Sequence, residues 1–125
     1  MSLNNDKTLL IYGFSIEEQQ MLDDIVEKLE LHPYRLINPY MADMKIKYIV
    51  KGLKIETYTG KLPEERVVLY NNFSDAELDK TIKAIREKIK ENIIMAAITP
   101  ISSKWTFKYL LEHLIKEREW YRLHK

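Results

Sequence analysis

A short apolar run that ends in a capped turn occurs twice in this chain. The runs are residues 9–12 and 67–70, and both consist largely of residues that favour strands. Each run is followed by a serine with a glutamate three residues later, the spacing of a helix capping box: Ser15 with Glu18, and Ser74 with Glu77. The pattern therefore predicts the same strand, turn and helix in each half of the chain.

Apolar residues recur at intervals of three and four after each capping box, as expected for a helix with one buried face. The first stripe runs from a predicted helix start at Ser15 to about Leu29 and consists of Met21, Leu22, Ile25, Val26 and Leu29. The second stripe consists of Leu78, Ile82, Ile85 and Ile89. We expect this second stripe to be buried against a sheet.

A second strand follows in each half, over residues 34–37 and 95–98. Each is stopped by a proline, which cannot donate a backbone hydrogen bond, and the stops are Asn38-Pro39 and Thr99-Pro100. A further helix is predicted after each proline. The first covers about residues 42–53, and Gly52 weakens its end.

The final helix carries an apolar stripe of Phe107, Leu110, Leu111 and Leu114 and is predicted to run on to about Leu123. The stretches 36–53 and 97–114, which contain the last strand and helix of each half, align without gaps. Four positions are then identical: Pro39 with Pro100, Lys47 with Lys108, Tyr48 with Tyr109, and Leu53 with Leu114. Together with the two capping boxes, this match favours an internal duplication.

We therefore predict an α/β fold made of two β-α-β-α pseudo-repeats, at about residues 8–53 and 66–115. The two units should form a roughly four-stranded, mostly parallel or mixed sheet covered by helices. At 125 residues the chain is expected to be a single domain, 1–125. Residues 54–65 are interpreted as the linker between the repeats, although 55–59 could add a short edge strand.

The composition indicates where the protein resides and which classes of partner are not expected. The absence of cysteine excludes a disulfide scaffold, a thiolate zinc site and a cysteine nucleophile, and it fits a reducing cytoplasm. The polar N-terminal residues and the short run at 8–12 suit neither a signal peptide nor a membrane span. Because 20 basic and 19 acidic residues are interspersed, nucleic-acid binding is not expected either.

Two segments, "VVLYNNFSDAEL" at 67–78 and "ITPISSKWTFKYLLEHL" at 98–114, resemble a family of small bacterial cytoplasmic proteins classed as a domain of unknown function. The resemblance covers most of the second half, and the first half agrees more loosely. It implies an asparagine where Ser102 stands here. It supports the fold and a cytoplasmic location and brings no activity with it.

No catalytic residue, cofactor or metal site is predicted. The three glycines are isolated, so neither a P-loop nor a dinucleotide fingerprint can be built. His113 and Glu117 have the helical spacing of two metal ligands, but a third ligand is not obvious nearby. The serines lack a nucleophile elbow, and Ser15 and Ser74 are better explained as helix caps. An enzymatic activity is therefore the less favoured interpretation.

Eight residues are candidates for contact with a ligand or a partner: Asn38, Thr99, Ser102, Lys104, Trp105, Trp120, Tyr121 and Leu123. The first five lie in the two strand-to-helix loops, 38–44 and 99–105, where open α/β sheets often bind ligands. Trp105 aligns with Met44, another large apolar residue, and this favours a packing role for it. The last three lie beyond the part of the final helix that has a counterpart in the first half.

Two hypotheses of function follow. The first is a non-catalytic protein-interaction or regulatory module, possibly a homo-oligomer that associates through the C-terminal helix. The alternative is a domain, possibly an enzyme, that binds a small ligand or an anion through the loops 38–44 and 99–105. Since no nucleophile, metal site or glycine loop is assembled in the sequence, we favour the first hypothesis.

Overall fold

The predicted order of strands and helices is present in both halves of the chain. The computed structural model describes residues 7–124, and the polar N-terminal segment 1–6 and Lys125 lie outside them. The first half contains β1 (Thr8–Tyr12), α1 (Ile16–Lys28), β2 (Arg35–Ile37), the short 3-10 turn η1 (Pro39–Met41) and α2 (Ile46–Val50). The second half contains β3 (Val67–Asn71), α3 (Asp75–Lys88), β4 (Ile94–Ala97), the 3-10 turn η2 (Ser102–Lys104) and α4 (Phe107–Leu123).

The four strands form one mixed sheet in the order β2-β1-β3-β4. The pairs β1–β2 and β3–β4 are parallel, and the central pair β1–β3 is antiparallel. Leu10 lies opposite Leu69 at the middle of that central pair. Each half thus contributes two parallel strands, and the antiparallel pairing of β1 with β3 joins the halves.

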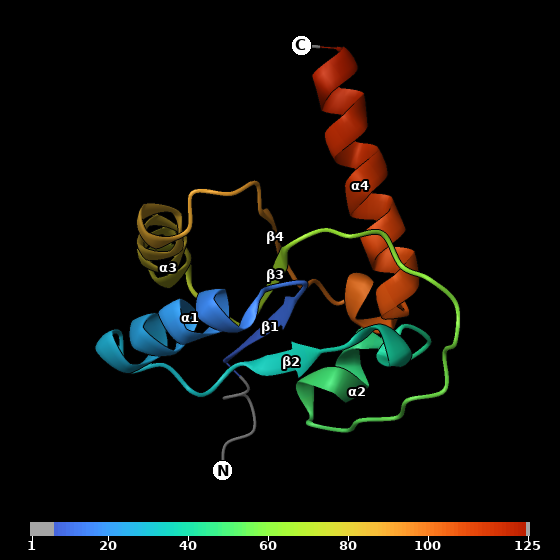
Figure 1. The fold of residues 1–125 in the computed structure, drawn as a ribbon, viewed down its shortest axis with the longest axis horizontal. Helices are drawn as coiled ribbons and strands as arrows, with labels where there is room; N and C mark the ends of the chain where they lie inside the picture. Colours follow the sequence, from blue (N-terminus) through green and yellow to red (C-terminus); the bar gives the residue numbers. More distant parts are fainter. Residues whose placement is uncertain (1–6, 125) are drawn as a thin grey trace.

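Helices cover both faces of the sheet, with α1 and α3 on one side and α2 and α4 on the other (Figure 1). Side chains alternate along a strand, so neighbouring residues of β1 enter different cores. Leu9 and Ile11 pack with α1 and α3, whereas Leu10 and Tyr12 pack with α2 and α4. The result is a three-layer α/β domain, as predicted for the fold class.

Both predicted capping boxes are formed. The Ser15 hydroxyl accepts a hydrogen bond from the Glu18 backbone N–H at 3.1 Å, and the Glu18 carboxylate accepts one from the Ser15 N–H at 2.9 Å. Ser74 and Glu77 repeat this arrangement at 3.2 and 2.9 Å. The serines therefore satisfy the amides at the helix starts, which is the role predicted for them.

The prediction of a helix over 42–53 was wrong in its length, because α2 covers only Ile46–Val50. Residues just before α2 pair with the second half instead of extending the helix. Lys45 is extended and forms an isolated antiparallel bridge with Thr106, and the Ile46 N–H donates to the Trp105 carbonyl at 2.9 Å. At the other end Gly52 adopts φ +90°, a left-handed conformation that stops the helix, as the sequence predicted.

The linker 54–65 crosses the molecule without forming the edge strand considered for 55–59. It is attached to the first half by single contacts, such as the hydrogen bond from the Tyr58 N–H to the Tyr40 carbonyl at 3.1 Å. The halves meet at equivalent places, since Lys45 and Thr106 also stand opposite each other in the gapless alignment. Superposition of the two halves stays a prediction.

Ile85 tests the packing of α3 on the sheet. It has no solvent-exposed surface, and it lies in the same core as Leu9 and Val68, while Leu78 and Ile82 pack partly buried beside it. We expect Ile85→Ala to lower the free energy of unfolding by about 2–5 kcal/mol, because it leaves a cavity in a closed core. Urea denaturation measures this, and a loss below about 1 kcal/mol would contradict the packing.

Candidate functional site

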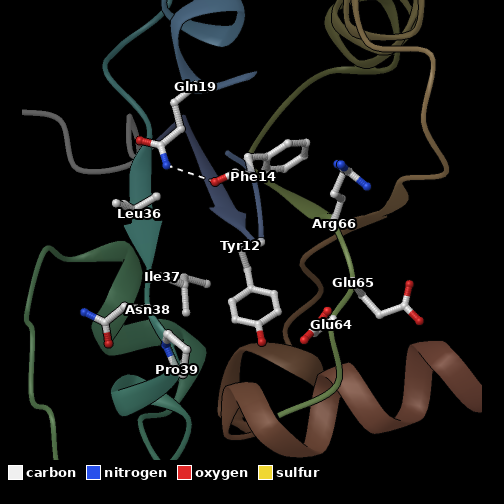
Figure 2. Close-up of a pocket in the computed structure, with 11 residues that line it drawn as sticks. Tyr12, Phe14, Gln19, Leu36, Ile37, Asn38, Pro39, Glu64, Glu65 and Arg66 are labelled. Atoms are coloured by element: carbon white, nitrogen blue, oxygen red, sulfur yellow. Dashed lines mark hydrogen bonds between the residues drawn. The ribbon is translucent and has the colours of Figure 1, made fainter. Parts of the chain in front are cut away.

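A pocket of about 550 Å³ opens where the parallel strands β1 and β2 end. Three segments line it: the end of β1 with the start of α1, the end of β2 with the start of η1, and the last linker residues before β3 (Figure 2). The lining residues are Tyr12, Gly13, Phe14, Gln19, Leu36, Ile37, Asn38, Pro39, Glu64, Glu65 and Arg66. Crevices at the carboxyl ends of parallel strands are the usual ligand sites of open α/β sheets.

Tyr12 stands between the β2 side and the linker side of this pocket, as Figure 2 shows. Its hydroxyl donates a hydrogen bond to the Pro63 carbonyl at 3.0 Å. Burial raises the pKa of this hydroxyl, and the carboxylate of Glu64 raises it further. Tyr12 therefore stays a neutral donor at physiological pH and does not supply a general base.

Most of the charged side chains near Tyr12 form ion pairs. Arg66 Nε donates to both carboxylate oxygens of Glu18 at 2.9 and 3.0 Å. The Arg118 guanidinium of α4 donates a hydrogen bond of 2.8 Å to each carboxylate oxygen of Glu65. These arginines lower the pKa of both carboxyl groups. Among the described lining residues, Glu64 is exposed and is not in either of these ion pairs. Because its carboxylate is negative, the pocket suits a neutral or cationic ligand better than an anion.

The Arg118–Glu65 pair makes stability depend on pH in a definite direction. Because the pKa of Glu65 is lowered in the folded state, the pair stabilises the protein above the ordinary carboxyl pKa of 4.5 and loses that effect as the pH falls through the lowered value. We expect Glu65→Gln to cost about 1–2 kcal/mol at pH 7 and much less at pH 3.

Urea denaturation of both proteins between pH 7 and pH 3 measures this difference. Glu112→Gln is the matched control, because it removes the exposed i,i+4 pair with Lys108 on the same helix. The control should change the pH dependence little. A constant difference between the wild type and Glu65→Gln at every pH would show that the carboxylate charge is not what stabilises the contact.

Only one of the two predicted loops takes part in this pocket. Asn38 lines the pocket, whereas residues 99–105 do not. Because β1 and β3 are antiparallel, the loops 38–44 and 99–105 leave the sheet at opposite ends. The ends of the loops meet on the α2 and α4 side of the sheet, where Lys45 pairs with Thr106 and the Phe107 N–H donates to the Met44 carbonyl.

Three of the predicted loop residues stabilise their loops through side-chain hydrogen bonds. Asn38 accepts a hydrogen bond from the Tyr40 N–H at 2.9 Å and donates one to Glu56. The Ser102 hydroxyl accepts from the Thr99 N–H at 2.9 Å, and the Thr99 hydroxyl accepts from the Ser102 N–H at 3.0 Å. Ser102 is buried. Its side chain is therefore engaged in the turn that follows β4.

The other two loop residues differ in burial. Lys104 is exposed. Trp105 is half-buried against the core beneath α4, with its ring 4.8 Å from that of Tyr109 and 5.1 Å from that of His113. Its placement agrees with the packing role that alignment with Met44 favours.

The three predicted residues of the C-terminal helix lie on its outermost turns. The C-terminal part of α4 extends away from the sheet (Figure 1). Trp120 is 54% exposed, Tyr121 66% and Leu123 81%. The Trp120 ring packs on Tyr121 and stacks on His124 at 4.2 Å between centroids. We call residues 117–123 the C-terminal overhang.

Of the residues that line the pocket, sequence reasoning named Asn38 as a candidate and missed the rest of the site. Its walls come from residues that are far apart in the chain, such as Tyr12 and Arg66, and neither belongs to a motif. The ion pairs that frame it join Glu18 to Arg66 and Glu65 to Arg118 over long sequence separations. A single sequence carries no signal for such pairs, because each member alone resembles ordinary surface charge.

Two absences apply to residues 7–124, the part of the chain that the structure describes. No group of three or more metal-binding side chains is found there, and the carboxylate beside the His113 imidazole is that of Glu117, at 3.7 Å. None of the helices has the length and the apolar composition needed to cross a lipid bilayer.

Comparison with known proteins bears on the second half of the chain. No curated protein and no solved structure matches the sequence significantly. A family model does match, and it contains both segments on which the resemblance was based, 67–78 and 98–114. That resemblance is confirmed: residues 66–121, from the start of β3 to the overhang of α4, match the family described as "Domain of unknown function (DUF3783)".

Proposed function

We propose that this chain is a non-catalytic protein-interaction module that forms a homodimer through the C-terminal overhang. The observation that carries the proposal is the cluster of Trp120, Tyr121 and Leu123, all more than half exposed on a helix that projects beyond the sheet. Large aromatic side chains are enriched at the centres of protein interfaces. Covering them removes apolar surface from water, which favours association.

Four hydroxyl groups at helix starts and turns also favour an interaction module over an enzyme. Ser15 and Ser74 cap helices, and Thr99 and Ser102 bond to each other. Groups that are engaged in this way are poor nucleophiles, because activation needs an adjacent general base. A regulatory role in a bacterial cytoplasm fits the module, and the cysteine-free sequence supports this location.

Light scattering on the full chain and on a chain truncated within α4 tests the proposal. The full chain should have the mass of two chains, and the truncated chain should have the mass of one. Equal masses for both proteins would reject self-association through the overhang.

Small-ligand binding is a second candidate function, and the pocket around Tyr12 favours it. We expect a neutral or cationic metabolite of matching size to raise the thermal stability, by about 2.7 kcal/mol at a hundredfold excess over its Kd. A thermal-shift screen measures this. Leu36→Trp is the control, because Leu36 lines the pocket and is about half exposed. A rise that persists in this variant would place the binding elsewhere.

A further inference from the structure

The strand β4 leaves one edge of the sheet open. It is the last strand in the order β2-β1-β3-β4, and among residues 7–124 the strand it pairs with is β3. Residues 93–98 are all apolar and contain neither a charge nor a proline, the usual devices that protect an edge strand from pairing. An edge of this kind is competent to accept another strand.

The backbone of β4 shows which groups face outward. The N–H of Ile94 donates to the Arg66 carbonyl, and the N–H of Ile98 donates to the Tyr70 carbonyl, both at 2.8 Å. Backbone groups alternate along a strand, so those of Met95 and Ala97 point away from β3. These two residues offer two donors and two acceptors along the free edge, spaced for another extended chain.

A groove of about 340 Å³ runs beside this edge. Arg86 of α3 borders it on one face of the sheet, and Leu114 and Tyr121 of α4 border it on the other. Its lining contains charges of both signs, Glu91 and Glu117 beside Arg86 and Arg122, in addition to Arg118, which is paired with Glu65. A partner that also carries both signs would complement it.

We infer that the partner strand is β4 of a second copy of this chain, paired antiparallel about a two-fold axis at Ala96. This inference rests on the proposed self-association and names its geometry. Two-fold pairing about Ala96 sets Met95 of each copy against Ala97 of the other, which are the two residues whose backbone groups face outward. Four backbone hydrogen bonds would join the copies, and the two four-stranded sheets would become one.

The position of α4 explains why a second copy suits this edge. The helix passes the starting ends of β3 and β4, where Arg118 holds Glu65 and Leu114 lies near Ile94, and its overhang continues beyond them. In the antiparallel pair, the start of one β4 lies beside the end of the other. The overhang of each copy thus reaches the turn after β4 in its partner, where Ile101 is 69% exposed. The interface is reciprocal, as two-fold symmetry requires.

Cross-linking tests the register, because the natural chain has no cysteine. In the proposed dimer the two copies of residue 96 form a pair without hydrogen bonds, about 4.5 Å apart between Cα atoms, which is within disulfide reach. Ala96→Cys should therefore give mainly covalent dimer under mild oxidation. Glu17→Cys, at an exposed position on α1, is the control and should stay largely monomeric on a denaturing gel. Equal cross-linking of both variants would overturn the inference.

Ala97→Pro is the second test. It removes an outward N–H and leaves the hydrogen bonds to β3 in place, so each subunit should fold. We expect the dimer dissociation constant to rise at least about tenfold, whereas Ala97→Val, which keeps the N–H, should change it little. If the wild type is dimeric but neither Ala96→Cys nor Ala97→Pro behaves as expected, the edge is not the interface and the proposed function stands. A monomeric wild type overturns both.

Discussion

Replacing Gly13 by alanine will lower the free energy of unfolding by more than about 3 kcal/mol. Gly13 follows β1 with φ +88°, a conformation that residues with a Cβ rarely adopt. A Cβ at this position would lie 1.9 Å from the backbone carbonyl oxygen of Glu65, far inside contact distance. The backbone before β3 would have to move, and this segment forms one wall of the pocket.

Gly52→Ala separates the clash from the conformational cost. Gly52 has nearly the same φ, +90°, but a Cβ there meets only the flexible guanidinium of Arg35, at 3.2 Å. We expect a loss of about 1–2 kcal/mol for this control, which comes from the backbone alone. Urea denaturation of the two variants gives both values. Equal losses would mean that the approach of Gly13 to Glu65 has little effect on stability.

Removal of the C-terminal overhang is expected to convert the proposed dimer to a folded monomer. Truncation after Lys116 deletes Trp120, Tyr121 and Leu123, the exposed apolar residues that we propose as the interface anchors. Anchors of this type carry a large part of the binding energy in protein interfaces, so their joint loss should raise the dissociation constant by several orders of magnitude. Light scattering and circular dichroism report association and folding separately.

A second truncation, after Glu119, controls for the ion pair that the first one breaks. The shorter chain also loses Arg118, which holds Glu65, and is therefore expected to be less stable. The longer chain keeps this pair and loses only the aromatic end. We expect both truncated chains to be monomeric. A dimeric chain ending at Glu119 would exclude the aromatic cluster as the interface, and loss of helical signal in that chain would mean that the cluster belongs to the core.

The local elements of this fold could be predicted from the sequence because their signals are local. A capping box joins residues three apart, and an apolar stripe repeats within a few turns. The bounds of α1 were therefore predicted to within a residue, and α3 follows its predicted capping box at Ser74. Pro39 and Pro100 mark the ends of β2 and β4 in the same way, and Gly52 marks the end of α2. The predicted extension of the final helix to Leu123 is also confirmed.

Features that depend on contacts between distant segments could not be predicted. The length of α2 is set by the pairing of Lys45 with Thr106, which overrides the helical pattern from residue 42 onward. The antiparallel pairing of β1 with β3 decides that the two loops leave opposite ends of the sheet. The pocket and the groove beside β4 follow from this arrangement, and neither has a signature in a single stretch of the chain.

Sedimentation equilibrium of the untagged full chain over a wide range of concentrations tests self-association most directly. The account predicts that the mass approaches twice the 15.0 kDa of the chain as the concentration rises, and that it does so reversibly. A mass that remains that of one chain at every concentration would contradict it.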